Sequence, residues 1–174
     1  DLEGINHVKQ LFFLFSKFGI LRDFKISNEL FFRFIYKIRS TYNDVPYHNW
    51  MHACDVTAYI AYQLTLSGFD KILSPLEKFS ILLASVCHDA NHEGFNNIYN
   101  IKAQTPFGIL FKDTSVMETH HITVAIDILS DDSTNVLYSL NEKDYKRMWV
   151  MFIQLVLATD MAKHFDIIKL TNTK

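Results

Sequence analysis

Apolar residues recur at helical spacing along nearly the whole chain, and no stretch shows sustained alternation of apolar and polar positions. The first two sets are Val8, Leu11, Phe12, Phe15 and Phe18, followed by Leu30, Phe31, Phe34, Ile35 and Ile38. Steps of three, four and seven residues place each set on one face of a helix. The pattern therefore predicts an all-α fold.

Capping and helix-breaking residues give the expected boundaries. Ser74-Pro75, followed by Glu77, is typical of the start of a helix, and the residues after it are strongly apolar up to Val86. Asp44-Val45-Pro46 indicates a break, because the residue before a proline is disfavoured in helical geometry. Other helices are predicted after Ser27, from near Tyr47 to Leu66, from Ser115 to Leu129, and after Asn141, with a turn at 131–133. A polar interruption is expected at 89–97, followed by a short segment to about Ala103.

Length, composition and charge describe one globular domain over residues 1–174. Of 174 residues, 49% are apolar, and 17 Lys and Arg against 19 Asp and Glu give a net charge of −2. This balance does not supply the basic surface that nucleic-acid binding needs, so we expect no nucleic-acid partner. The longest apolar run, Met148 to Ala158, contains Gln154 and is shorter than the roughly 18 residues of a membrane span. We expect no membrane contact from this segment.

The first residues favour a domain taken from a longer protein. Asp1 and Glu3 stand where a signal peptide carries basic residues, and the two cysteines, Cys54 and Cys87, do not resemble a disulfide framework. We expect this domain on the cytoplasmic side, with a membrane tether elsewhere in the protein left open. The abundance of Phe, Ile, Asn and Lys is typical of an AT-rich genome, such as that of a protozoan parasite.

Histidines give the strongest indication of chemistry. His48 and His52 are four residues apart on one predicted helix, which places both rings on the same face. Such a pair alone is more often solvated or structural than metal-binding. However, His88-Asp89 and His92 follow the most hydrophobic predicted helix, where burying imidazole and carboxylate groups is costly without a compensating partner. These donors suit divalent ions, and Asp89 is a candidate bridge between two of them.

A later pair, Glu118 and His121, is three residues apart and faces one direction on its predicted helix. Glu-x-x-His pairs are common on helix surfaces, so we expect these residues to orient ligands or water molecules rather than to bind an ion directly. The chain has no G-x-S-x-G element and no phosphate-binding glycine-rich loop. Metal-assisted hydrolysis is the reaction class that remains.

Four sequence elements resemble those of the class I 3′,5′-cyclic nucleotide phosphodiesterases. Residues 47–56 resemble the Y-H-N-x-x-H-A-x-D-V element, and residues 88–97 the H-D-x-x-H-x-G-x-x-N element. Residues 117–121 are similar to L-E-x-x-H, with Met117 in place of the commoner Leu, and residues 158–164 to A-T-D-M-x-x-H. The elements occur in the family's order. The resemblance implies a compact multi-helix bundle of the His-Asp metal-dependent phosphohydrolase type.

The resemblance also implies a role for each matched residue. His52, His88 and Asp89 would bind a zinc-like ion, Asp89 would bridge to magnesium or manganese, and His48 would be the general acid. The remaining implied residues are His92, Glu118 and His121 around the second ion and its waters, Tyr47 and Met161 at the substrate pocket, and Asn49 and Asn97 as structural hydrogen-bonding groups. The implied substrate is a cyclic nucleotide.

The family pattern includes residues that cannot be placed in this chain, which therefore resembles a domain truncated on its C-terminal side. A fourth ligand, an Asp, and the glutamine and hydrophobic clamp for the purine are expected beyond Lys174. Asp160 should not replace that ligand, because its counterpart in the motif does not bind metal. The choice between cAMP and cGMP, and the oligomeric state, stay open.

The implied reaction is hydrolysis of the 3′ phosphoester bond by a metal-activated hydroxide, with His48 protonating the leaving oxygen, which ends cyclic nucleotide signalling. Two alternatives remain. One is another nucleotide phosphohydrolase of the His-Asp type. The other is a non-catalytic helical module, which would describe this chain as an isolated fragment.

Overall fold

The computed structural model describes residues 2–112, 114–164, 168 and 169, and the side chains from residue 5 onward. These residues form helices and connecting loops without any strand, which confirms the predicted all-α class. The helices are α1 (Leu2–Lys17), α2 (Ile20–Asp23), α3 (Asn28–Arg39), α4 (Trp50–Leu66), η1 (Phe69–Lys71), α5 (Pro75–Cys87), α6 (Asn97–Lys102), α7 (Pro106–Phe111), α8 (Val116–Ser130), α9 (Glu142–Leu157) and η2 (Met161–Lys163). None of them is long and apolar enough to cross a bilayer.

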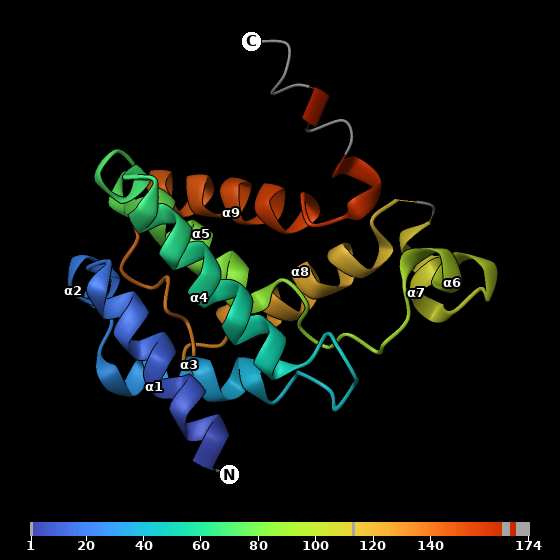
Figure 1. The fold of residues 1–174 in the computed structure, drawn as a ribbon, viewed down its shortest axis with the longest axis horizontal. Helices are drawn as coiled ribbons and strands as arrows, with labels where there is room; N and C mark the ends of the chain where they lie inside the picture. The colour runs from blue at the N-terminus through green and yellow to red at the C-terminus, as the bar shows by residue number, and fades with distance from the viewer. Residues whose placement is uncertain (1, 113, 165–167, 170–174) are drawn as a thin grey trace.

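Helix α5 is the centre of the bundle. It begins with a capping box, in which the Ser74 hydroxyl accepts from the Glu77 amide and the Glu77 carboxylate accepts from the Ser74 amide. Phe79, Leu82 and Leu83 on this helix are fully buried. Helices α9 and α4 are its main neighbours, and α9 crosses the α4–α5 pair (Figure 1). The central position of α5 follows from its nearly continuous apolar sequence.

Aromatic packing joins α5 to the N-terminal helices. Phe15 of α1 contacts Phe31 of α3 with ring centroids 5.1 Å apart, and it meets Phe79 edge-on at 6.5 Å. Phe24, after α2, lies 4.9 Å from Phe79. Such tilted and edge-on arrangements are favourable for aromatic rings. The first apolar sets of the sequence therefore form the hydrophobic core that supports α5.

The predicted start of α4 is wrong by three residues. The helix begins at Trp50, because the Asn49 side chain accepts a hydrogen bond from the His52 amide and caps the helix. Asn49 itself has extended backbone geometry, with φ −108° and ψ −177°. Tyr47 and His48 therefore lie in the loop before α4 rather than on its first turn.

Helices α6 and α7 form a small lobe beside α8, at the right of Figure 1. The sequence analysis did not predict α7, although Thr105 caps it and Pro106 is its first residue. The two short helices pack closely at Gly108, where an added Cβ would lie 2.1 Å from the backbone oxygen of Asn100. Thr105 also donates to the buried Asn100 side chain. Asn97 and Ile98, at the start of α6, contribute to the lining of the cleft described next.

Candidate metal centre

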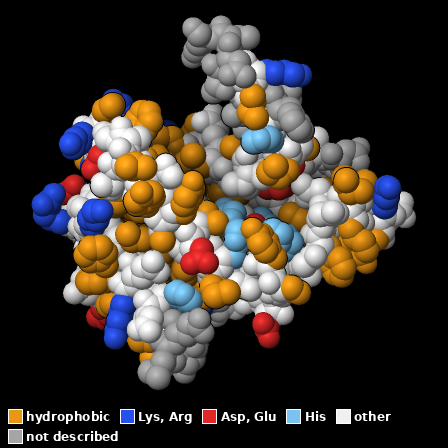
Figure 2. All heavy atoms as spheres, in the orientation of Figure 1, with side chains coloured by type: hydrophobic (Ala, Val, Ile, Leu, Met, Phe, Trp, Pro, Cys, Tyr) orange, Lys and Arg blue, Asp and Glu red, His pale blue; other side chains and the backbone are white. Residues whose placement is uncertain are grey.

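A cleft of about 810 Å³ lies where α4, α5, α8 and η2 approach one another. Its polar lining includes Tyr47, His48, His52, His88, Asp89, His92, Asn97, Glu118, His121, Thr159 and Asp160. Figure 2 shows histidine side chains gathered around the hollow near the centre of this face, with acidic side chains among them. The structure thus brings together all the site residues predicted from the sequence; Met161 lines the cleft as well.

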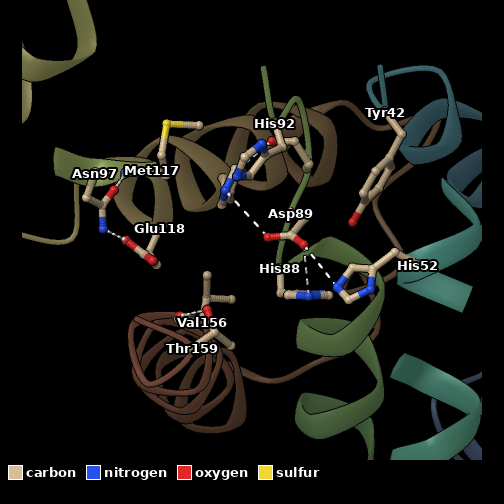
Figure 3. A network of polar contacts seen from close by, with 12 residues as sticks. Tyr42, His52, His88, Asp89, His92, Asn97, Met117, Glu118, Val156 and Thr159 are labelled. Carbon is tan, nitrogen blue, oxygen red and sulfur yellow. Dashed lines mark hydrogen bonds and ion pairs between the residues drawn. The ribbon is translucent and has the colours of Figure 1, made fainter. Parts of the chain in front are cut away.

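The first group of candidate metal-binding atoms comes from α4 and from the turn after α5. His52 Nε2 lies 3.3 Å from Asp89 Oδ2, and His88 Nε2 lies 3.2 Å from the same oxygen (Figure 3). The candidate ligand atoms of these three residues all lie within 4.8 Å of one another. His88 caps the end of α5, and the chain then turns tightly, with the Ala90 amide bonded to the Cys87 carbonyl.

A hydrogen bond of His88 shows which of its two ring nitrogens carries the proton and which has a lone pair. Its Nδ1 lies 2.8 Å from the Ser85 carbonyl oxygen, which can only accept, so Nδ1 carries a proton. In the neutral ring, Nε2 therefore has a lone pair directed at Asp89 Oδ2. That oxygen is buried and has no hydrogen-bond partner among the described residues. The neutral His88 Nε2 and the ionised Asp89 Oδ2 therefore repel each other unless a positive charge lies between them.

Charge effects in this group agree with that requirement. Burial lowers the pKa of His88, but its interactions with Asp89 and with the Ser85 carbonyl outweigh burial and leave it raised. Burial opposes ionisation of Asp89, yet its interaction with His88 and the attraction of other nearby histidines hold its pKa well below its usual range. Burial lowers the pKa of His52, and His88 lowers it further. A proton on His88 can supply the charge, and a divalent ion could be held by the same atoms.

The second group consists of Asp89, His92 and His121, whose candidate ligand atoms also lie within 4.8 Å of one another. His121 Nδ1 lies 2.6 Å from the Ala90 carbonyl oxygen, which leaves Nε2, at 3.8 Å from Asp89 Oδ1, with a lone pair. Burial lowers the pKa of His121 to about 3, so the ring is neutral near pH 7. Asp89 is therefore shared by both groups, one carboxylate oxygen facing each.

His92 differs from the other rings in its tautomer. Its Nδ1 accepts a hydrogen bond of 2.9 Å from the Gly94 amide, so the neutral ring carries its proton on Nε2. Burial and the neighbouring His48 lower the pKa of His92 to about 4, which keeps the ring neutral near pH 7. An N–H group in this position suits contact with water or an anion better than direct metal ligation.

His48 belongs to neither group, although it lies close to both. Its ring stacks on His92 with centroids 4.1 Å apart and lies 5.6 Å from the ring of His52. Tyr47 contacts the His52 ring and is largely exposed at the rim of the cleft. Met161, on η2, is also largely exposed. His48 lies outside α4, contrary to the prediction, but it remains close to His52 because the chain turns at Asn49 beside the cleft.

Glu118 and Asp160 line the cleft without belonging to either group. Glu118 accepts a hydrogen bond of 2.9 Å from Asn97, and burial raises its pKa. Asp160 accepts from the Ser115 hydroxyl at 2.8 Å and from the Ala162 amide at 3.0 Å. Both of its carboxylate oxygens therefore have protein partners.

Two residues behind the cleft were not identified from the sequence. Tyr42 donates a hydrogen bond to the Val86 carbonyl oxygen, and Asn43 donates one to the His92 carbonyl oxygen. These residues precede the matched elements and have no metal-binding groups of the usual kinds. No local sequence signal distinguishes them, because their partners are more than 40 residues away in the chain.

Comparison with known proteins gives a consistent family. The family model described as 3′5′-cyclic nucleotide phosphodiesterase matches residues 47–174. The chain is 39% identical over 154 residues to the 3′,5′-cyclic-nucleotide phosphodiesterase regA of Dictyostelium discoideum, covering 88% of this chain and 19% of that protein. It is 34% identical over 177 residues to the human dual specificity calcium/calmodulin-dependent phosphodiesterase 1C, covering 99% of this chain and 25% of that protein.

Solved structures agree with these sequence relatives. The phosphodiesterase domain of the RhoPDE fusion protein from Salpingoeca rosetta matches with a TM-score of 0.88 and 29% identity, covering 92% of this chain and 50% of that one. LmjPDEB1 in complex with IBMX matches with a TM-score of 0.85 and 35% identity, covering 90% of this chain and 48% of that one. The chain thus spans about half the length of these solved domains and about a quarter or less of the curated relatives.

Proposed function

This chain belongs to the 3′,5′-cyclic nucleotide phosphodiesterase family, and we propose that its protein hydrolyses the 3′ phosphoester bond of cyclic nucleotides to give nucleoside 5′-monophosphates. Residues 1–174 would form the N-terminal and central part of the catalytic domain. Relatives are named for cAMP, for cGMP and for dual specificity, so the proposal covers both nucleotides. The reaction would end cyclic nucleotide signalling.

The observation that carries this proposal is the position of the Asp89 carboxylate. Its two oxygens face two groups of imidazoles, and Oδ2 has no hydrogen-bond partner among the described residues. Burying such an oxygen is unfavourable unless a cation or a donor satisfies it. An arrangement of this kind is difficult to explain as packing alone and fits two divalent ions that share one carboxylate.

We assign His52, His88 and Asp89 to a zinc ion, because imidazole nitrogen with one carboxylate suits zinc. We assign the second ion, magnesium or manganese, to Asp89, with His92, Glu118 and His121 arranged around it and its waters. When bound, such ions stabilise charge on the phosphoryl group and lower the pKa of water. The Nε2–H of His92 would then donate to a water or phosphate oxygen.

His48 is proposed as the general acid. In the reaction, an oxygen from water forms a bond to phosphorus, the bond from phosphorus to the 3′ oxygen breaks, and that oxygen takes up a proton. His48 suits this proton transfer because it belongs to neither group of metal-binding atoms, yet its ring lies within 5.6 Å of His52 and stacks on His92. Tyr47 and Met161, at the rim, would contact the nucleotide.

The test is an assay of the full-length protein with cAMP and cGMP, in the presence of zinc and magnesium and after their removal by a chelator. We expect metal-dependent formation of the 5′-monophosphate. Hydrolysis of nucleoside monophosphates or triphosphates, without turnover of either cyclic nucleotide, would favour the other His-Asp phosphohydrolases. Metal binding without turnover of any of these nucleotides would favour a non-catalytic module.

A further inference from the structure

We propose that Tyr42 and Asn43, in the loop between α3 and α4, are positioning residues that hold the turn of residues 88–92 in the geometry needed for metal binding. This inference rests on the proposed metal-dependent function. It assigns a role to two residues that contact the backbone of the turn rather than any metal ligand atom.

Tyr42 holds the beginning of the turn. Its hydroxyl donates a hydrogen bond of 2.7 Å to the carbonyl oxygen of Val86, in the last turn of α5. This carbonyl would bond the Ala90 amide if the helix continued, but that amide bonds Cys87 instead. Burial raises the pKa of Tyr42 well above its usual value, so the hydroxyl keeps its proton. Tyr42 thus satisfies a carbonyl that the tight turn leaves free.

Asn43 holds the other end. Its side-chain amide donates to the His92 carbonyl oxygen at 3.0 Å and to the Asn91 side-chain oxygen at 3.1 Å. Asn91 has a left-handed backbone with φ +58°, and its own amide lies 3.1 Å from His120 Nε2 on α8. The side chain of Asn91 is therefore held by Asn43 on one side and by His120 on the other. These contacts stabilise a backbone conformation that is unusual for a residue other than glycine.

The same loop also fixes α4, which carries His52. The Tyr42 ring meets the Trp50 ring edge-on, with centroids 5.7 Å apart, and Trp50 is the first residue of α4. Figure 3 shows the Tyr42 side chain extending toward the turn that carries Asp89. One loop thus contacts both the start of α4 and the turn after α5, which are the two elements that supply the first group of ligands.

The physical consequence concerns metal affinity more than global stability. Ligands that are held in position lose little freedom when they bind an ion, and loss of such outer contacts typically lowers metal affinity by roughly 10–100-fold. Removing one hydroxyl from a tyrosine costs the fold about one hydrogen bond and leaves the packing of the ring in place, so the variant should remain folded and its metal affinity can be measured. The two effects can therefore be separated experimentally.

The experiment compares Tyr42→Phe with Tyr138→Phe in the full-length protein. Tyr138 is a matched control, because its hydroxyl also donates to a backbone carbonyl, that of Lys25, and it does not line the cleft. We expect a decrease in thermal stability for both variants, larger for Tyr42→Phe, because its hydroxyl bonds the carbonyl of the fully buried Val86, whereas Tyr138 is largely exposed. Zinc affinity, measured by competition with a chelator, should fall about 10-fold for Tyr42→Phe only. The visible spectrum of bound Co²⁺ should change in the same variant.

Asn43→Ala provides a second test, which is independent of the Tyr42 variant. Asn43 is exposed, so its substitution should leave the protein folded. We expect weaker Mn²⁺ binding, with Asn135→Ala as the control; the Asn135 side chain bonds the Leu137 amide away from the cleft. Unchanged metal affinity and Co²⁺ spectrum in both loop variants would contradict the inference while leaving the proposed function intact. Failure of the unmodified protein to bind divalent ions would contradict both.

Discussion

Helix α5 connects two clusters of aromatic rings, and the two clusters differ in what they need for stability. Around Phe79, the phenylalanine rings of the N-terminal helices pack at centroid distances of 4.9–6.5 Å. Beyond the C-terminal end of α5, the histidine rings lie at similar distances, 4.1 Å for His48 and His92 and 5.3 Å for His52 and His88. Only the second cluster contains nitrogen lone pairs and a carboxylate.

This difference separates stability from function within one fold. A buried phenylalanine needs only apolar neighbours, so its cluster is complete within the protein. The imidazoles face Asp89 with atoms that need a further positive charge, because Asp89 Oδ2 lies close to two ring nitrogens yet has no hydrogen-bond partner among the residues that the structure describes. Substitutions in the first cluster should therefore affect folding, and substitutions in the second should affect binding and turnover.

The largest expected effect comes from His52→Ala in the histidine cluster. Loss of a direct ligand should lower zinc affinity by more than the roughly 10–100-fold that is typical of outer contacts, and turnover should be lost with the metal. Metal content measured after dialysis checks this prediction. His7→Ala, on α1 and outside both groups, is the control. Retention of stoichiometric zinc by His52→Ala would show that the ligand assignment is wrong.

His48→Ala should separate catalysis from metal binding inside the same cluster. Because His48 is outside both groups of ligands, the variant should keep its metal, but turnover should fall by roughly 10²–10⁴-fold through loss of general acid catalysis. Steady-state kinetics and metal analysis of the same preparation measure both quantities. Parallel loss of metal and turnover would argue that His48 contributes to ligation instead.

Phe79→Ala tests the other cluster. Removing this fully buried ring should lower the free energy of unfolding by about 3–5 kcal/mol, because a cavity remains in the core. Urea denaturation gives the value, and Phe13→Ala, where the ring is 63% exposed, should change it by less than about 0.5 kcal/mol. Similar losses in the two variants would contradict a core centred on Phe79.

The smallest effect is expected at the surface end of α5. Ser74→Ala should cost about 1 kcal/mol of stability near pH 7, since it removes the N-cap. The Ser74 hydrogen bonds lower the pKa of Glu77, so their contribution is present above the usual value of 4.5 and is lost as the pH falls through the lowered pKa. The difference in stability between Ser74→Ala and the unmodified protein should therefore become smaller in acid, which thermal unfolding at several pH values would measure. A stability difference that does not change with pH would contradict a contribution from ionised Glu77.

The helices could be predicted wherever local signals agreed with tertiary packing. Ser74, Pro75 and Glu77 mark the start of α5, because capping depends on neighbouring residues only. The start of α4 was misplaced, since the break at Asp44-Val45-Pro46 suggested a helix from near Tyr47, while the Asn49 side chain caps the helix later. Helix α7 was missed because six residues give too little periodicity.

The sequence by itself determined the helical class, the apolar faces and the types of residue available for metal chemistry, because these depend on spacing along the chain. Only the tertiary structure decided that His48 stacks on His92, that Asp89 is shared between two groups, and which ring nitrogens have lone pairs. The physical reason is that these properties depend on contacts between distant segments. The hydrogen bond from Tyr42 to Val86 is such a contact, formed across 44 residues of chain.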